Sequence, residues 1–155
     1  MKLLKPLLIL LILFMGKTNY SQEKSTLKLA MAQMLVEGGQ KQNNLNRAVQ
    51  RIEEAAKNKA DIILLPEAMD LGWTHSAAKT EAEPIPGGST FETLAKAAKK
   101  NNIYVCAGII EKDKDRTFNA AVLINRNGEL ILKHRKINEL DIAHDLYDQG
   151  DRINV

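Results

Sequence analysis

The chain has 155 residues, enough for one domain with a modest hydrophobic core. Its content of 45% hydrophobic and 26% charged residues is ordinary for a globular protein. The formal net charge of +3 comes from three lysines in the first 21 residues, and the remaining 19 basic residues balance 19 acidic ones. This balance excludes a basic field of the kind that binds nucleic acid.

Residues 1–22 have the layout of a secretory signal peptide. Two lysines begin the segment, residues 7–15 form an unbroken apolar run, and residues 16–22 are polar. The apolar run is too short to span a bilayer comfortably as a transmembrane helix. We therefore expect an exported protein, periplasmic or secreted. Anchoring in the membrane through residues 3–15 is the alternative.

The first part of the exported chain predicts a strand, a helix and a second strand. Residues 27–35 are mostly apolar and end at a Gly-Gly turn, which indicates a buried strand. We expect a helix from a cap at Asn43 or Asn44 to about Asn58, because its apolar residues fall on one face. The apolar run 61–65 then predicts a strand parallel to the first, in a sheet covered by helices.

The middle of the chain predicts a loop and a second helix. The polar stretch 74–83 leads into residues 84–88, where two prolines and two glycines can only form a loop. Ser89 or Thr90 is expected to cap a helix that continues to Lys100, with its apolar residues on the inner face.

The last part predicts strands at residues 103–110, 118–124 and 129–133. The final two are joined by the Asn-Arg-Asn-Gly turn at 125–128, a strong hairpin signal. The fold class is therefore α/β with a mixed sheet, parallel at first and antiparallel later.

Two charged side chains lie where predicted strands end. Glu67 follows an apolar strand, at the kind of rim where α/β proteins bind ligands. Apolar neighbours would raise the pKa of its carboxyl group and suit it to act as a general base. Lys136 leaves the last predicted strand and could stabilise a developing oxyanion. From position alone, an ordinary solvated strand end is the favoured interpretation of both residues.

The segments around these two positions resemble the nitrilase superfamily of carbon-nitrogen hydrolases. Residues 64–67 (Leu-Leu-Pro-Glu), followed by Gly-Trp at 72–73, are similar to the family's first catalytic segment. His-Arg-Lys at 134–136, after strand 118–124 and a glycine turn, is similar to the second. In order and spacing, the resemblance covers roughly residues 27–151. Further matching features are Met31-Ala32-Gln33, Gly38, Asn44, Pro86-Gly87 and Ala107-Gly108.

The resemblance implies that residues 26–155 form the N-terminal half of a four-layer α-β-β-α sandwich. It also implies a Glu-Lys-Cys triad in which Glu67 is the general base and Lys136 stabilises the tetrahedral intermediate. The cysteine nucleophile is expected beyond Val155, so the domain would be truncated before the nucleophile strand. The sole cysteine present, Cys106, lies in an apolar run and is expected to be a buried, inert core residue.

Many family members place a supporting glutamate between the lysine and the cysteine. Glu139, close to Lys136, and His144 are the candidates for this position, and an ordinary surface helix is the alternative reading of the segment. Asn119, at the rim of the sheet, is expected to tie down a loop rather than to touch substrate.

Two functions remain open. The first is a secreted amidase-like hydrolase that acts on the non-peptide C–N bond of a small amide or nitrile, homo-oligomeric when full length, as family members often are. Thiol, carboxylate and ammonium groups suffice for this chemistry, so no metal or other cofactor is expected. The alternative is a catalytically inactive, shortened chain that acts as a binding or assembly module. A nucleotide-binding βαβ unit is excluded because no glycine-rich phosphate loop follows the first strand.

Overall fold

The computed structural model describes residues 26–154, and the predicted signal peptide lies outside them. The described part contains five strands in one sheet, three helices and one 3₁₀ turn. The strands are β1 (Leu29–Met31), β2 (Ile62–Leu64), β3 (Tyr104–Asp113), β4 (Arg116–Ile124) and β5 (Leu130–Arg135). The helices are α2 (Lys41–Lys57), α3 (Ala77–Glu81) and α4 (Ser89–Asn101), and the 3₁₀ turn is η1 (Asp141–Ala143).

The sheet is mixed, as the sequence predicts. Strands β1, β2 and β3 are parallel, β4 and β5 are antiparallel, and the order in space is the order in the chain. The predicted turn between β4 and β5 is confirmed, with Gly128 at a φ of 82°. A second hairpin joins β3 to β4 through Lys114, at a φ of 54°. It was not predicted, because its turn contains neither glycine nor asparagine.

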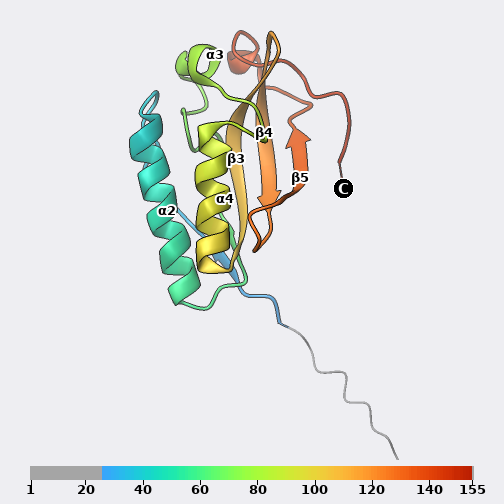
Figure 1. The fold of residues 1–155 in the computed structure, drawn as a ribbon. Coiled ribbons are helices and arrows are strands. Elements are labelled where there is room, and N and C mark those ends of the chain that lie inside the picture. The colour runs from blue at the N-terminus through green and yellow to red at the C-terminus, as the bar shows by residue number, and fades with distance from the viewer. Residues whose placement is uncertain (1–25, 155) are drawn as a thin grey trace, which may run out of the picture.

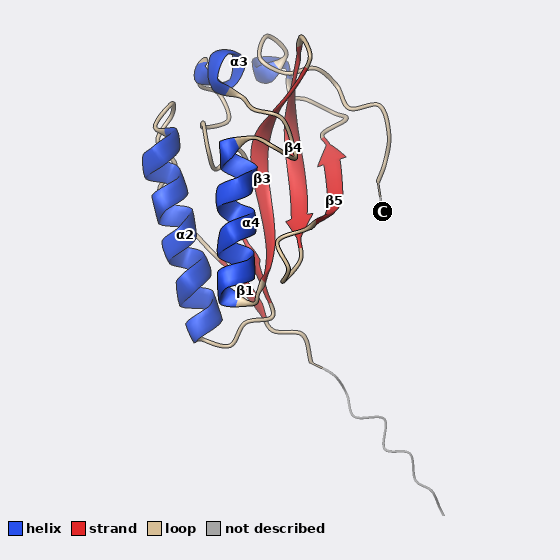
Figure 2. Ribbon diagram, in the orientation of Figure 1, coloured by secondary structure: helices blue, strands red, loops and turns tan. Residues whose placement is uncertain are grey.

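Helices α2 and α4 lie side by side against one face of the sheet (Figures 1 and 2). Their apolar stripes meet alternate residues of the strands, so the helical and the extended periodicities bury the same layer. Each fully buried leucine or isoleucine contributes about 1.5–3 kcal/mol relative to exposure. The residues least exposed in this layer include Ala48, Ile52, Ile63, Leu94, Ala98, Val105, Ile109 and Ile124.

Two predictions about the first elements are wrong. Strand β1 is not buried, because Leu29 and Met31 lie on the face of the sheet that α2 and α4 do not cover, where they are 50% and 78% exposed. Helix α2 is not capped by Asn43 or Asn44, since it begins at Lys41. Asn44 instead lies fully buried inside the helix, where its side chain bonds the backbone of Glu37 and the carbonyl oxygen of Asp70.

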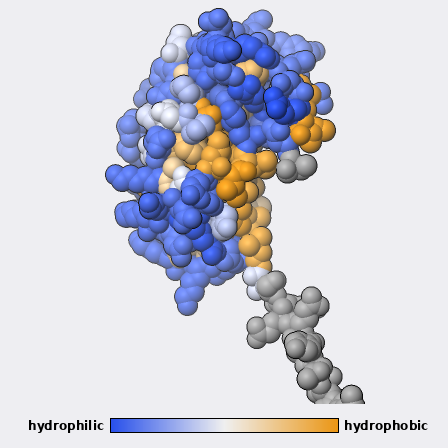
Figure 3. Space-filling view, turned by 45° about the vertical axis from the view of Figure 1, so that its right-hand side comes forward, coloured by the Kyte–Doolittle hydropathy of each residue, from blue (hydrophilic) through white to orange (hydrophobic). Residues whose placement is uncertain are grey.

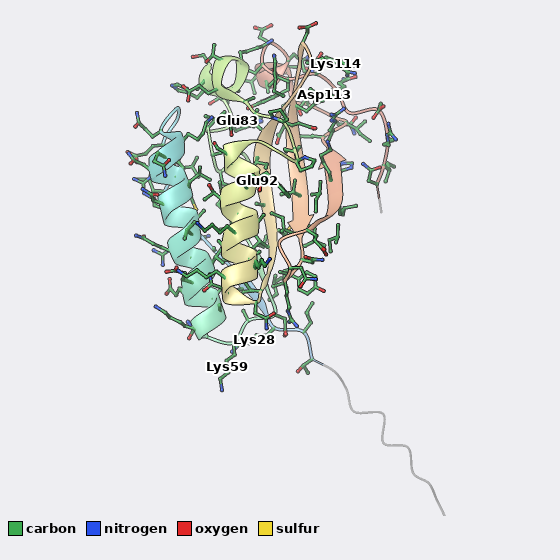
Figure 4. The ribbon with its side chains drawn as sticks, in the orientation of Figure 1. Lys28, Lys59, Glu83, Glu92, Asp113 and Lys114 are labelled. Carbon is green, nitrogen blue, oxygen red and sulfur yellow. The ribbon has the colours of Figure 1, made fainter. Side chains whose placement is uncertain are left out.

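The segment before α4 is also more ordered than the sequence predicts. The polar stretch 74–83, for which no element was predicted, contains helix α3. Helix α4 begins at Ser89, and neither Ser89 nor Thr90 supplies a side-chain cap. The carboxylate of Glu83 accepts hydrogen bonds from Thr90 N and Ser89 Oγ instead, close to the start of the helix (Figure 4).

The face of the sheet opposite α2 and α4 carries a cross-strand row of apolar side chains. Figure 3 shows an apolar band that continues toward the start of the described chain. Within residues 26–154, no helix has the length and apolar character needed to cross a membrane. In strand order, the row on this open face is Met31, Leu64, Cys106, Leu123 and Leu132.

Candidate active site

Glu67 lies in the turn after β2, where the chain leaves the sheet. The backbone remains tied to β3 on both sides of this residue, through Gly108 N to Pro66 O at 3.1 Å and Met69 N to Gly108 O at 2.9 Å. Ala68 reverses the chain with a φ of 47°. A Cβ atom at position 108 would lie 2.6 Å from Glu67 Cα, so the close approach of the turn requires glycine there.

The structure brings Glu67 and Lys136 together, although they are 69 positions apart in the chain. Glu67 Oε1 accepts a hydrogen bond from Asn119 Nδ2 at 2.7 Å and one from Lys136 Nζ at 3.1 Å. The backbone aligns the two donors, because Lys136 N donates to Asn119 O at 2.8 Å. Asn119 therefore lies inside β4 and holds a carboxylate, whereas the sequence suggested that it ties down a loop.

The pKa of the Glu67 carboxyl is lowered, so the predicted increase is wrong. Burial raises this pKa, but the hydrogen bonds from Asn119 and Lys136 and the charge of Lys136 together outweigh it. The Glu67 side chain is 54% exposed, which limits the penalty of burial, and both donors favour the charged form. Glu67 is therefore ionised at neutral pH and able to accept a proton.

A second carboxylate, Glu139, approaches Lys136 from the other side. Glu139 Oε2 lies 3.6 Å from Lys136 Nζ, and neither carboxylate oxygen has a hydrogen-bond partner within the described chain. Burial raises the pKa of Glu139, while the charge of Lys136 opposes this effect. Burial lowers the pKa of Lys136, but the hydrogen bond to Glu67 and the charge of Glu139 give a net increase. Lys136 therefore remains a cation between two carboxylates.

Trp73 and Tyr147 complete the surroundings of Lys136. The ammonium group of Lys136 lies 5.3 Å from the centroid of the Trp73 ring, a cation–π contact. The hydroxyl of Tyr147 donates to the carbonyl oxygen of Trp73 at 2.6 Å, and Gly150 N donates to Lys136 O at 2.8 Å. The segment after β5 is thus fastened back onto the site. Tyr147 was not identified from the sequence, where it is an isolated aromatic residue in a polar segment.

His144 lies next to this group and makes no hydrogen bond or ion pair with Glu67 or Lys136 among the described contacts. Its Nε2 atom is 3.1 Å from the carbonyl oxygen of Glu139, and its Nδ1 atom is 3.8 Å from the carboxylate of Asp141. The side chain is half exposed. His144 therefore supports the backbone that carries Glu139.

Cys106 is not a core residue, and that prediction is wrong. Its side chain belongs to the open face of the sheet and is only partly buried, because the register of β3 places Val105 and Ala107 in the helix-covered layer. It lines a cavity of about 300 Å³ together with Glu67, Asn119 and Lys136. Burial raises the pKa of the Cys106 thiol, which disfavours the reactive thiolate.

The arrangement offers an ionised carboxylate and an ammonium group that line one cavity. A carboxylate can take up a proton, and a fixed ammonium group can stabilise an oxyanion that forms beside it. Among residues 26–154, no three histidine, cysteine or carboxylate side chains are grouped so as to hold a metal ion.

Comparison with known proteins identifies the family to which the chain belongs. The chain is 39% identical over 119 residues to omega-amidase NIT2 of Mus musculus, an alignment that covers 76% of this chain and 42% of that protein. It is 33% identical to a nitrilase of Pyrococcus abyssi, covering 80% of this chain and 48% of that protein. The chain thus spans less than half the length of these curated relatives.

Solved structures agree with the sequence comparison. Saccharomyces cerevisiae Nit3, a member of the nitrilase superfamily, superposes with a TM-score of 0.73 at 28% identity, over 81% of this chain and 49% of that one. An amidase from Nesterenkonia sp. AN1 gives a TM-score of 0.75 at 17% identity, over 83% and 51%, which shows a shared fold. The carbon-nitrogen hydrolase family profile matches residues 28–155. The chain therefore belongs to the carbon-nitrogen hydrolases of the nitrilase superfamily and has part of their fold.

Proposed function

We propose that this protein hydrolyses the C–N bond of small amides or nitriles, with Glu67 as the general base and Lys136 as the oxyanion-stabilising cation. The observation that supports this proposal is that one oxygen, Glu67 Oε1, accepts two hydrogen bonds, from Asn119 Nδ2 at 2.7 Å and from Lys136 Nζ at 3.1 Å. The lowered pKa keeps this carboxylate ionised at neutral pH, the form that can accept a proton, and Lys136 is fixed beside it.

The reaction on an amide would proceed by covalent catalysis through a cysteine thiol. Glu67 takes the thiol proton, and the thiolate attacks the carbonyl carbon. Lys136 stabilises the oxyanion of the resulting tetrahedral intermediate. The intermediate then collapses to a thioester, and the protonated Glu67 returns its proton to the departing amine. Glu67 next accepts a proton from water as the hydroxide attacks the thioester. The thiolate leaves as the acid is released, and the protonated Glu67 returns its proton to the sulfur, which regenerates the thiol.

We assign the nucleophile to a cysteine outside residues 1–155, since Cys106 is poorly suited to the role. Burial raises the pKa of Cys106, and its thiol makes no hydrogen bond with Glu67 among the described contacts. A nucleophilic cysteine needs the opposite, a lowered pKa or an adjacent base.

Glu139 and Asn119 have supporting roles in this proposal. The buried carboxylate of Glu139 lies 3.6 Å from Lys136 Nζ and favours its protonated form. Asn119 holds Glu67 in the orientation that faces the cavity. His144 acts one step further away, through the Glu139 carbonyl oxygen.

The test is ammonia release by the complete protein from a panel of aliphatic amides and nitriles. Aliphatic ω-amides come first in the panel because of the similarity to mouse omega-amidase. We expect turnover by the wild type and a loss of about 10²–10⁴-fold in kcat for Glu67→Gln. The matched control is Glu92→Gln, an exposed glutamate on α4, which is expected to retain wild-type turnover. Absence of turnover in the wild type would favour the inactive binding module instead.

We also propose export of the protein, on the basis of the signal-like residues 1–22. Mass spectrometry of the protein secreted by its host is expected to find a mature N-terminus near Ser21 or Gln22. An intact N-terminus on membrane-bound protein would favour anchoring through residues 3–15.

A further inference from the structure

Asp70 is a buried acid in the turn that carries Glu67. It is only 1% exposed, although it lies in an irregular segment between β2 and α3. Both oxygens of its carboxylate accept the backbone N–H of Ile110, at 3.3 Å and 3.2 Å. The mechanism proposed above makes no use of this side chain.

The contact with Ile110 takes the place of a backbone hydrogen bond between neighbouring segments of the sheet. Along one edge of β3, even-numbered residues bond the segment that follows β2, as Cys106 O does with Leu65 N and Gly108 N with Pro66 O. The N–H of Ile110 faces the same edge but meets no strand carbonyl, because the chain has already turned away at Ala68. A buried N–H without a partner is costly, and the Asp70 carboxylate satisfies it.

We propose that Asp70 is a positioning residue for Glu67, which fastens the turn to β3 at Ile110 and loosens it when the carboxylate is neutralised. The proposal rests on the role of Glu67 in the proposed function. Gly108 ties the turn to β3 at Pro66 and Met69, on either side of Glu67, and the Asp70–Ile110 contact ties it one residue further on. Weakening this last contact loosens the end of the turn that aims Glu67 at Asn119 and Lys136.

The surroundings of Asp70 place its titration in the physiological range. Burial raises the pKa of Asp70 to about 6, although the N–H groups of Ile110, Asp70 and Leu71 and the charge of Lys41 act in the opposite direction. Tyr147 also faces Asp70, and its pKa is raised by burial and by the charge of Asp70. Neutralisation of Asp70 therefore also changes the electrostatic environment of Tyr147, whose hydroxyl donates to the Trp73 carbonyl oxygen.

Glu67 and Asp70 are protonated in different ranges of pH. The pKa of Glu67 lies below the ordinary value of 4.5, whereas Asp70 titrates at about 6. Activity limited only by protonation of Glu67 would persist well below pH 6. A loss of activity at acidic pH with a midpoint near 6 would therefore be caused by protonation of Asp70 in the turn rather than by protonation of Glu67.

The experiment follows Ile110 and Glu67 by NMR in protein labelled selectively with ¹⁵N-isoleucine and ¹³C-glutamate. In the wild type, we expect the Ile110 amide and the Glu67 carboxyl resonances both to shift with a midpoint of about 6. In Asp70→Asn, both shifts at this midpoint should disappear. The matched control is Asp148→Asn, because Asp148 also accepts a strand N–H, from Thr117 at 2.9 Å, but lies outside the Glu67 turn. It should behave as the wild type does.

The inference is overturned if the Ile110 amide shows no transition between about pH 5 and 7, or if Glu67 responds only to its own titration. If Asp70→Asn does not fold, Lys41→Met serves in its place. Loss of the Lys41 charge should move the Ile110 midpoint to higher pH, and an unchanged midpoint would contradict the inference. These readouts need no turnover, so failure of the proposed hydrolase activity is recognised separately, by the amide assay.

Discussion

Glu67 passes so close to Gly108 that a side chain at position 108 would overlap its backbone. A Cβ atom there would lie 2.6 Å from Glu67 Cα, 2.9 Å from the backbone nitrogen of Ala68 and 3.0 Å from the carbonyl oxygen of Pro66. These atoms belong to the turn itself, which cannot move aside as a flexible side chain can. The position of Glu67 is therefore set partly by the absence of a side chain on the neighbouring strand.

Gly108→Ala should displace Glu67. We expect kcat of the hydrolase to fall about 100-fold, as for a misplacement of roughly 1 Å, and stability to fall by about 1–3 kcal/mol. Amide turnover and urea unfolding are the measurements. Gly87→Ala is the control. Its φ of 105° strains an alanine, as the overlap does at position 108, but an added Cβ at position 87 meets nothing within 4 Å. Equal losses of turnover in both variants would contradict the explanation.

Asn119→Ala should raise the pKa of Glu67, because it removes a hydrogen bond to the charged form. The ionised carboxylate is the active form, so the loss of activity caused by protonation of Glu67 should begin at a higher pH than in the wild type. We expect a loss of about tenfold in kcat at neutral pH, the value of one hydrogen bond. Titration of the Glu67 carboxyl by ¹³C NMR checks the direction, and a pKa that stays in place or falls would refute the assigned role of Asn119.

Glu111→Ala should cost stability rather than activity. Glu111 is 2% exposed and accepts hydrogen bonds from Arg135 at 2.6 Å and 2.9 Å, and it also pairs with Lys133. Removing one member of a buried ion pair typically costs about 3–5 kcal/mol. Urea unfolding measures the loss. Asp113→Ala, which removes the exposed partner of Arg135 at the end of the β3–β4 hairpin (Figure 4), should have little effect.

Asp70 should make the stability of the protein fall with pH. Its folded pKa of about 6 lies above the ordinary 3.8, so the folded state holds a proton that the unfolded state has released in this window. Stability that is present below about pH 4 is lost as pH rises toward 6, by roughly 3 kcal/mol, because the cost of burying the charged carboxylate exceeds the gain from its stronger contact with Ile110. The measurement is the difference in unfolding free energy between the wild type and Asp70→Asn across this range. A difference independent of pH would show that Asp70 has an unshifted pKa.

The elements with one clear periodicity could be predicted from the sequence. Helix α4 has a single apolar stripe and ends near the predicted residue, and the turn before β5 carries its own asparagine and glycine. The mixed sheet followed from these elements. The pairing of Glu67 with Lys136 was implied by the family resemblance, and the structure places the two side chains 3.1 Å apart.

The remainder depended on contacts between distant segments. Strand β3 is apolar on both faces, so its sequence could not show that Cys106 faces away from the helices. The pKa of Glu67 depends on an asparagine 52 positions away. Aspartate is a residue type common in surface turns, and Asp70 is buried against Ile110 only because the chain leaves β2 early.

The agreement between strand order and chain order has a consequence for biosynthesis. Because every strand pairs with the strand made just before it, a chain that folds as it emerges from the ribosome can extend the sheet one strand at a time. The turn that carries Glu67 can then settle against β3 while the later strands are still being translated. Lys136 follows β5, the last of these strands, so its ion pair with Glu67 would close only after the rest of the sheet has formed.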